Sequence, residues 1–368
     1  MMPALFALGF RPFYLLAGAY AALSVPLWAL QFAGWLPGAN PLWHAHEMLF
    51  GYAFAVIAGF LLTAVRVWSG RPTPTGVALA LIAGLWLLSR IVALQSLQAS
   101  AWIDLAFAAA LALGIGRPLV ASGNRRNWFF IALMLVLGVA SIAFSGYSRI
   151  GMLVGLDVVL LIMAVMGGRV IPAFTNSAIQ GAGARRNRIV EYAALGSLLL
   201  VLLFDALELL VPAGIVCLIG APLHAVRLAL WSPWATRARP ILWILHLSYA
   251  WIVVHLLLRS LAGFEVVTPG LATHALTVGA IGGLTLGMMT RTARGHTARP
   301  LEVGGAELAA YVLVHAAAAV RVFLPLVFPD AYVAWIIASA ALWFAAFALF
   351  TAVYLPILLQ PRLDGQPG

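Results

Sequence analysis

The chain has 368 residues, of which 64% are hydrophobic and only 9% are charged, a composition that excludes an ordinary soluble protein and indicates a bilayer environment. All 21 basic residues are arginine, and they are spread along the chain between apolar runs rather than gathered into a patch. This distribution excludes nucleic-acid binding and is typical of membrane topology signals. The single cysteine, Cys217, excludes a disulfide, a cysteine-ligated cluster and a CxxC redox pair, so any metal must be held by His, Met or carboxylate side chains.

A membrane-spanning helix needs about 20 mainly apolar residues, and the sequence predicts about twelve such spans separated by short polar or Gly/Pro-marked breaks. Their expected limits are residues 12–33, 44–65, 77–95, 100–117, 127–145, 150–173, 190–210, 212–231, 241–261, 272–292, 306–326 and 332–359. The eighth span is the weakest, because it contains His224, Arg227 and the potentially kinking Pro222. We therefore expect an all-α polytopic membrane protein that forms one integral membrane domain over residues 1–368.

The arginine positions predict the orientation of these spans, since cytoplasmic loops near span ends are enriched in basic residues. If twelve spans alternate, Arg149 is the only loop arginine that falls on the outer side. Both termini are therefore predicted to be cytoplasmic. The loops 34–43, 96–99, 146–149, 262–271 and 327–331, together with the short break around residue 211, are predicted to face outward.

Charged side chains inside spans are costly unless they face a protein interior, so each is a candidate functional residue. The candidates are Glu47, Arg90, Asp104, Asp157, Arg169, Asp205, Glu208, Arg227, Arg259 and Arg321. Pairing with one another or snorkelling to the interface is the favoured explanation for Arg90, Asp104, Asp205 and Glu208. Glu47, Arg169 and Arg321 are harder to explain in that way.

Eight histidines lie in or at the predicted spans: His44, His46, His224, His246, His255, His274, His296 and His315. His44 and His46 open the second span and His274 opens the tenth, all from the predicted outer side, which is the arrangement that a metal or haem iron needs. If helical, His44 and His46 point about 200° apart, so they cannot both hold one metal. Glu47, or a backbone carbonyl near the helix start, could accept the hydrogen bond that a ligating histidine donates from its second nitrogen.

The remaining histidines are explained more simply. His246 and His255 lie about 180° apart on one helix and cannot share a site, whereas His255 and Arg259 share a face. Hydrogen bonding between helices is the favoured role for His224, His255 and His315. A stripe of small residues in the tenth span, made of Gly279, Gly282, Gly283 and Gly287, permits close helix packing and would equally let a flat macrocycle approach the backbone.

One motif covers residues 43–51 (WHAHEMLFG), and others cover residues 9–13, 58–65, 167–172, 245–246, 274–277 and 289–297. In this joint order they resemble the NnrS family of bacterial membrane proteins over nearly the whole chain. The resemblance implies a haem- and copper-containing inner-membrane protein associated with nitric oxide, nitrosative stress tolerance and denitrification. Residues 66–70 (RVWSG) depart from the Pro-Asn-Trp-Thr-Gly usual in the family, which concerns the cytoplasmic end of the second span and not the outer histidines.

A looser resemblance is to the catalytic subunit of haem-copper oxidases, where one haem is held by histidines of spans 2 and 10. Residues 44–50 (HAHEMLF) resemble their span 2 pattern, which implies that His44 and His274 hold a haem b and that three four-helix units would fit. His46 is then left for a second metal or a gating role. The sixth and seventh spans lack the copper-binding histidines of those oxidases, so a dioxygen-reducing copper centre of their design is not expected. Arg321 and Arg259 are candidates to pair with haem propionates.

These patterns lead to one main prediction and two alternatives. We expect a haem protein with a redox or nitric-oxide-handling role, surrounded by membrane lipid, with nitric oxide as a candidate gaseous ligand and an electron donor that the sequence does not identify. His246 and His296, with Arg291 nearby, could form a second metal site, with copper as the candidate metal. The alternatives are a twelve-span transporter of a small solute or metal ion along Glu47, Asp157 and Arg169, and a sensor or assembly partner. Whether the chain is a haem-dependent oxidoreductase stays open.

Overall fold

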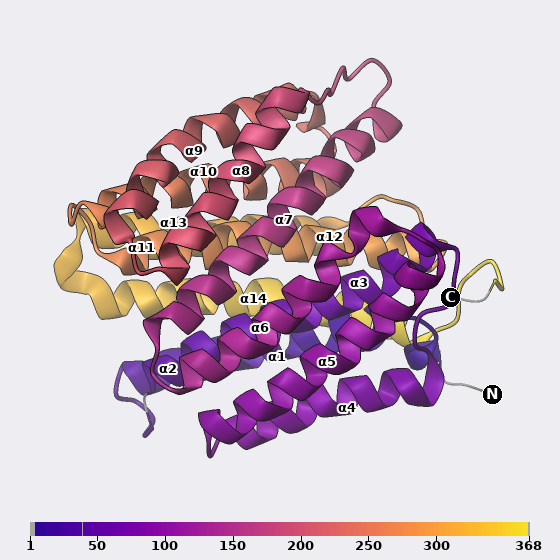
Figure 1. Cartoon of the computed structure of the whole chain (residues 1–368), viewed down its shortest axis with the longest axis horizontal. Coiled ribbons are helices and arrows are strands. Elements are labelled where there is room, and N and C mark those ends of the chain that lie inside the picture. The colour runs from indigo at the N-terminus through magenta and orange to yellow at the C-terminus, as the bar shows by residue number, and fades with distance from the viewer. Residues whose placement is uncertain (1–3, 39, 367–368) are drawn as a thin grey trace. The chain divides into compact units, whose positions relative to one another are not determined.

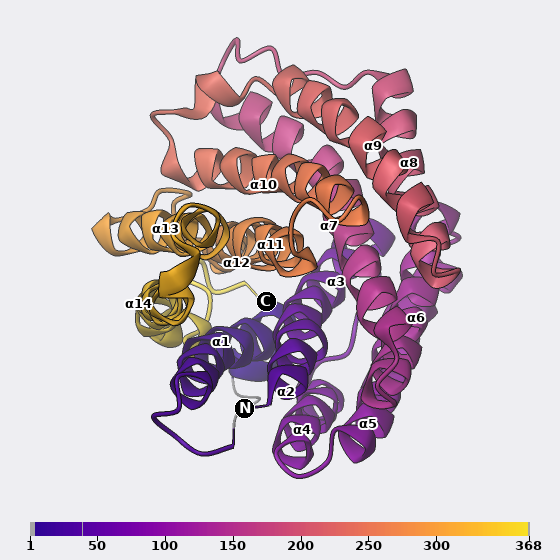
Figure 2. The same ribbon diagram turned by 90° about the vertical axis from the view of Figure 1, so that its left-hand side faces the viewer.

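The computed structural model describes residues 4–38 and 40–366, which contain helices and no strand (Figures 1 and 2). Twelve stretches of helix in this part of the chain are long and apolar enough to cross a membrane. They are Phe10–Phe32, Pro41–Ser69, Gly76–Ala93, Leu97–Ala121, Arg125–Ser145, Arg149–Ala178, Arg188–Ala206, Leu210–Leu230, Pro240–Gly263, Pro269–His296, Gly305–Val327 and Pro329–Leu359. The predicted all-α class and number of spans are confirmed, and the protein is a multi-pass membrane protein. The weak eighth span is one helix, α9 (Leu210–Leu230), which continues through Pro222.

The chain divides into two compact units, and each is described by itself. Unit 1 comprises Met1–Val158, Met289–Leu301 and Phe347–Gly368, and unit 2 comprises Val159–Met288 and Glu302–Ala346. Unit 1 contains α1 (Phe10–Phe32), α2 (Pro41–His46), α3 (Phe54–Ser69), α4 (Gly76–Ala93), α5 (Leu97–Ala121) and α6 (Phe129–Ser145). Unit 2 contains α8 (Arg188–Ala206), α9, α10 (Pro240–Gly263), α11 (Pro269–His274) and α13 (Gly305–Val327). Three helices pass from one unit into the other: α7 (Arg149–Ala178), α12 (Gly283–His296) and α14 (Tyr332–Leu359).

Two spans contain a wide π-helical segment near one end. In the second span α2 is followed by the segment η2 (Glu47–Ala53), and in the tenth span α11 is followed by η5 (Ala275–Gly282). A π-helical turn holds one more residue than an α-helical turn and is found frequently at functional sites. Each segment begins directly after a histidine, His46 in one span and His274 in the other.

In unit 1, α1 packs against α3, and α5 packs against α3, α4 and α6. The contact between α1 and α3 joins two of the sequence motifs, residues 9–13 and 58–65. A Cβ atom on Gly9 would lie 2.4 Å from the Leu62 Cβ atom, and the Phe10 amide donates to the Thr63 hydroxyl at 2.9 Å. A side chain at position 9 would need the space that Leu62 of α3 occupies, so only glycine fits there.

In unit 2, α9 packs between α8 and α10, while α11 and η5 pack against α10 and α13. Side chains of neighbouring helices fill the space beside the glycines of the tenth span. A Cβ atom on Gly279 would lie 2.4 Å from the Trp251 ring, and one on Gly282 would lie 2.6 Å from the Trp343 ring. These contacts favour close packing as the explanation of the glycine stripe.

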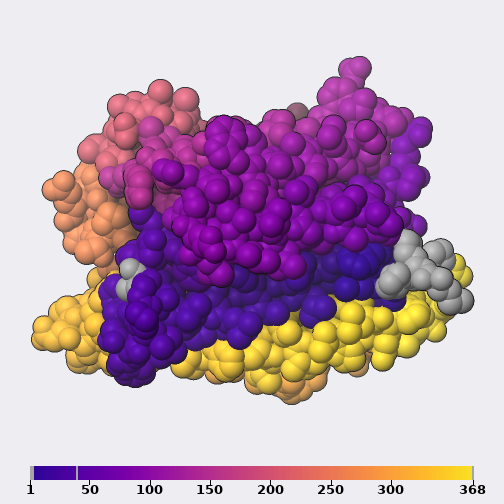
Figure 3. Space-filling view, turned by 90° about the horizontal axis from the view of Figure 1, so that it is seen from below, coloured from indigo at the N-terminus to yellow at the C-terminus, as the bar shows by residue number. Residues whose placement is uncertain are grey.

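The outer side chains of the helices are apolar, as a bilayer requires. On α4, for example, Val77 and Leu81 are 76% and 67% exposed, while Trp86 on the opposite face is buried. Figure 3 shows the indigo and purple helices of unit 1 in space-filling form. Apolar side chains of this kind match the hydrocarbon of a lipid bilayer better than water.

Arginines secure the carboxyl-terminal part of unit 1. The guanidinium of the buried Arg11 donates to the backbone oxygens of Leu358 and Gln360 at 3.0 and 2.6 Å, and so caps the end of α14. Beyond α14, Arg362 donates to the backbone oxygen of His296 at 3.2 Å. Hydrogen bonds from Arg362 also lower the pKa of the Asp364 carboxyl to about 2.

Candidate functional site

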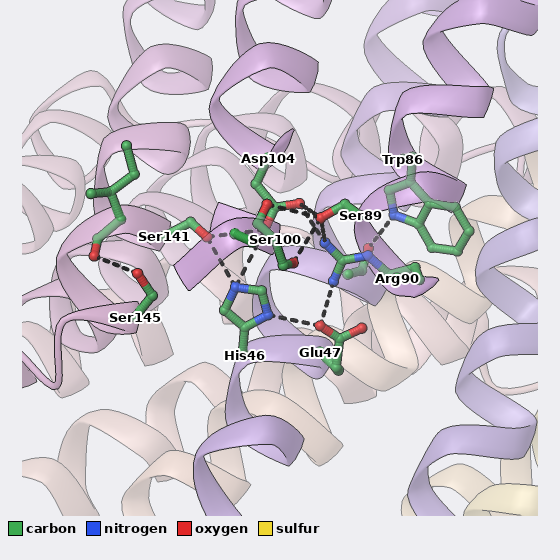
Figure 4. A network of polar contacts seen from close by, with 12 residues as sticks. His46, Glu47, Trp86, Ser89, Arg90, Ser100, Asp104, Ser141 and Ser145 are labelled. Carbon is green, nitrogen blue, oxygen red and sulfur yellow. Dashed lines mark hydrogen bonds and ion pairs between the residues drawn. The ribbon is translucent and has the colours of Figure 1, made fainter. Parts of the chain in front are cut away.

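A buried polar cluster surrounds the start of η2 in unit 1 (Figure 4). Its four ionisable members, His46, Glu47, Arg90 and Asp104, are at most 3% exposed. The Arg90 guanidinium donates to Glu47 Oε1 at 2.8 Å and makes a short ion pair with the Asp104 carboxylate. Isolated charges are costly inside a membrane protein, and these ion pairs offset the cost of burying charged side chains from three neighbouring segments. We refer to these four residues as the unit-1 cluster.

His46 is held between the two carboxylates of this cluster. Its Nδ1 atom lies 2.7 Å from Glu47 Oε1, and its Nε2 atom lies 3.1 Å from the Ser141 hydroxyl and 3.3 Å from Asp104 Oδ2. Both ring nitrogens therefore face hydrogen-bonding oxygen atoms. A metal at either nitrogen would have to displace one of these contacts.

Further hydrogen bonds connect the unit-1 cluster to α1, α4 and η2. The Tyr20 hydroxyl makes a short hydrogen bond to the Glu47 carboxylate, and the Trp86 indole donates to the backbone oxygen of Gly51 at 2.9 Å. The position of Gly51 leaves no room for a side chain, since a Cβ atom there would lie 2.7 Å from the Arg90 Nη1 atom. The π-helical segment is thus stabilised by donors and packing from neighbouring helices.

His44, the expected span 2 ligand, lies outside this cluster. It is half-buried in α2, and its ring stacks on the Trp28 ring with centroids 4.1 Å apart and planes 17° apart. The structure therefore separates the roles of the two neighbouring histidines, as their expected opposite directions predict: His46 enters the polar cluster, and His44 packs against an aromatic ring of α1.

His274, the expected span 10 ligand, ends α11 in unit 2. Its Nδ1 atom donates to the backbone oxygen of Gly270 at 2.6 Å, because a carbonyl can only accept. This bond fixes the ring orientation and leaves the lone pair of the neutral ring on Nε2, as is usual for a ligating histidine. The helices that carry the two histidine sites also correspond in length and in their first and last residues. Both α2 and α11 have six residues, begin with proline and end with histidine, so the positional counterpart of His274 is His46 rather than His44.

A second buried cluster lies in unit 2 and joins Glu191, His224, Arg227 and Tyr249, the unit-2 cluster. Arg227 pairs with Glu191 through two parallel hydrogen bonds of 2.9 and 2.8 Å, and its Nη1 atom donates to the Tyr249 hydroxyl at 2.6 Å. His224 donates from Nε2 to the Ala194 oxygen at 3.1 Å, and its Nδ1 atom lies 2.7 Å from the Tyr249 hydroxyl. The hydrogen-bonding role expected for His224 is confirmed.

Comparison with known proteins adds the family. A family model described as NnrS protein matches residues 4–362, which is nearly the whole chain. The chain belongs to the NnrS family. No curated protein matches the chain.

The two clusters explain glycines in the NnrS motifs. Gly51 ends the motif of residues 43–51, and its hydrogen atom faces Arg90. Gly168 belongs to the motif of residues 167–172, and a Cβ atom there would lie 2.0 Å from Arg227 Nη2. Glu191 and Gly168 were not predicted from the sequence to belong to a polar site. The double glycine directly before a charged residue inside a span is the signal that could have pointed to them.

The two arginines considered for propionates differ in their partners. Arg259 makes a 2.5 Å ion pair with Asp205 Oδ2, whereas Arg321 donates to the Tyr332 hydroxyl at 3.1 Å and lies 5.3 Å from the centre of its ring. The pairing favoured for Arg90, Asp104 and Asp205 is confirmed. Arg259 already has a carboxylate partner in the protein, so Arg321 is the better candidate to bind the carboxylate of a ligand.

The residues proposed for a second metal belong to different units, His246 to unit 2 and His296 to unit 1. The ring nitrogens of His246 lie 3.1 and 3.3 Å from the backbone oxygens of Leu242 and Trp231, and the ring of His296 packs 5.7 Å from that of Phe10. In residues 4–38 and 40–366, no group of three or more His, Cys, Asp or Glu side chains is placed to hold a metal ion. The two remaining histidines make hydrogen bonds, His255 to the Ala272 oxygen and His315 with the Trp251 indole.

Proposed function

We propose that this NnrS protein binds haem b in the bacterial inner membrane and has a redox or nitric-oxide-handling role in nitrosative stress tolerance or denitrification. The observation that carries the proposal is the hydrogen bond from His274 Nδ1 to the Gly270 oxygen at 2.6 Å. It is the contact that a histidine ligand needs in order to present Nε2 to a metal. Membership of the family supports the same proposal.

The proposed iron ligands are His44 and His274, and each fits a haem by its own surroundings. His274 is half-buried and held by a backbone carbonyl, and His44 is half-buried and held by the face of Trp28. Rings held in this way lose little freedom when they bind a metal, which favours binding. Haem iron, when bound, supplies one-electron chemistry and a site for a small gaseous ligand such as nitric oxide.

The other polar residues have supporting roles in this proposal. Arg321 is the preferred partner for a propionate, and Arg259 is second because of its pair with Asp205. Glu47 holds His46 and Arg90 and thereby fixes the start of η2, close in sequence to His44. His46, His246 and His296 stay candidates for a further metal such as copper, and both termini are proposed to be cytoplasmic.

The experiment is an optical spectrum of the purified protein, oxidised and reduced, with and without nitric oxide. We expect a haem spectrum that changes on reduction, and we expect His44→Ala and His274→Ala each to lower haem content. His315→Asn is the matched control, because His315 contacts Trp251 and is not a proposed ligand. Protein without iron or haem absorption would refute the proposal.

Two other results would redirect it. Loss of haem in His46→Ala with normal haem in His44→Ala would move the span 2 ligand to the residue that matches His274 in position. Solute uptake by proteoliposomes that contain haem-free protein would favour the transporter.

A further inference from the structure

A pocket of about 380 Å³ opens at one end of unit 1, outside both polar clusters. It lies where α1, α4 and α6 end and where α2 and α5 begin, the end that the arginine distribution predicts to face outward. A volume of this order is sufficient for a small organic ligand. We propose that this pocket binds the head group of a neutral, membrane-dissolved quinone or quinol.

The charge of the pocket lining is the first feature that bears on the ligand. None of the described residues that line the pocket is acidic, basic or histidine. An ionised ligand that entered the pocket would lose its hydration and would find no side chain of opposite charge there, which is costly. The lining therefore selects against phosphate, carboxylate and amine groups, and it favours an uncharged ligand.

The pocket lining also supplies neutral hydrogen-bonding groups. Four amide side chains line the pocket. The Asn40 oxygen accepts from the Leu42 and Trp43 amides, whereas the side chains of Gln31, Gln95 and Gln98 have no hydrogen-bond partner among the described residues. Trp43 also lines the pocket and is 9% exposed, while its indole nitrogen is buried without a hydrogen-bond partner in the described part of the chain. A buried donor of this kind needs an acceptor, and a ligand carbonyl would supply it.

The backbone of the pocket wall holds one aromatic residue in an unusual conformation. Tyr147 lines the pocket and has a φ of 64°, in the left-handed region that a bulky residue rarely occupies. Glycine would relieve that strain, yet the chain places an aromatic ring there. Aromatic rings such as those of Tyr147, Trp43 and Phe144 suit contact with another flat ring.

The rim of the pocket carries apolar side chains. Three leucines that line the pocket are also exposed on the surface of unit 1: Leu27 by 40%, Leu42 by 37% and Leu94 by 68%. These side chains face outward where lipid is expected, so an apolar tail could leave the pocket along them. A neutral hydrogen-bonding ring with a long apolar tail is the chemistry of an isoprenoid quinone.

Binding of the quinone does not depend on the proposed haem. Use of a bound quinol as the electron donor would rest on the proposed function, because the electrons need the haem iron as acceptor. The test therefore measures binding alone, so failure of the haem proposal and failure of this one are separate results.

The test uses the full chain in nanodiscs of saturated phosphatidylcholine, with equilibrium dialysis of a benzoquinone that carries a decyl chain. We expect saturable binding of about one quinone per chain. Gln98→Leu and Gln31→Leu should each weaken it about two- to tenfold, as loss of one neutral hydrogen bond predicts. Gln98 is exposed, so its replacement should leave the fold intact, and Gln180→Leu, in an exposed turn of unit 2, is the matched control.

A tryptophan pair provides a second comparison that is independent of the amides. Trp43→Phe keeps a ring but removes the buried donor, and it should weaken binding, whereas Trp102→Phe on the exposed face of α5 should not. Equal binding by the wild-type chain and by Gln98→Leu, Gln31→Leu and Trp43→Phe would overturn the proposal. So would equal competition by decylbenzene, which indicates a tail site only, or by diacylglycerol, which indicates a neutral lipid site.

Discussion

The Arg227–Glu191 pair of the unit-2 cluster depends on the absence of a side chain at Gly168, and Gly168→Ala tests this dependence. A Cβ atom at position 168 would lie 2.0 Å from Arg227 Nη2 and 2.9 Å from Glu191 Oε2. Real Cβ atoms do not approach other heavy atoms that closely, so the guanidinium must move. It cannot move without loss of its two hydrogen bonds to Glu191 at 2.9 and 2.8 Å.

The expected cost follows from two opposing effects. Disruption of a buried ion pair that leaves a charge uncompensated costs about 3–5 kcal/mol. Replacement of glycine by alanine inside a helix contributes about 0.5–1 kcal/mol in the other direction. We therefore expect Gly168→Ala to lower the free energy of unfolding by about 2–4 kcal/mol.

The assay is unfolding in detergent, followed by tryptophan fluorescence. Gly196→Ala is the matched control, since Gly196 lies in α8 with no atom within 4 Å of a built Cβ, and it should stabilise slightly. On an Arg227→Met background the effect of Gly168→Ala should largely disappear, because the group that it displaces is gone. An equal loss of stability on both backgrounds would refute the reasoning, as would a Gly168→Ala protein as stable as the Gly196→Ala protein.

Three further predictions concern unit 1. Gly51→Ala should lower the free energy of unfolding by about 1–3 kcal/mol, because a Cβ atom would lie 2.7 Å from Arg90 Nη1, whereas Gly84→Ala, with open space around it, should not; detergent unfolding compares them. Arg11→Met removes two hydrogen bonds to backbone oxygens at the end of α14, so amide exchange there should become faster, and unchanged exchange would contradict the capping role. Tyr147→Gly should stabilise the fold by about 1 kcal/mol, because it relieves a positive φ, and should weaken quinone binding; a loss of stability, or unchanged affinity in the dialysis assay, would contradict this prediction.

Much of the candidate site could be expected from the sequence, but not its connections. The sequence singled out Glu47, Arg90 and Asp104 as charged residues in spans, and it separated His44 from His46 by helical periodicity. Glu47 was predicted as a possible hydrogen-bond partner of an iron-ligating histidine, whereas in the structure its carboxylate contacts His46 and Arg90. The choice of partner depends on the depth and rotation of separate helices, which no local spacing encodes.

The sequence alone determined that this protein is helical and that the described part of the chain has twelve helices long and apolar enough to cross a membrane, because the length of an apolar run is a local property matched to the thickness of the bilayer. The tertiary structure decided the rest of the site. In the π-helical segment η2, the Gly51 carbonyl accepts a hydrogen bond from the Trp86 indole on α4. Gly168 faces Arg227 from α9. Both are contacts between helices, and their energy is gained only after the helices have packed.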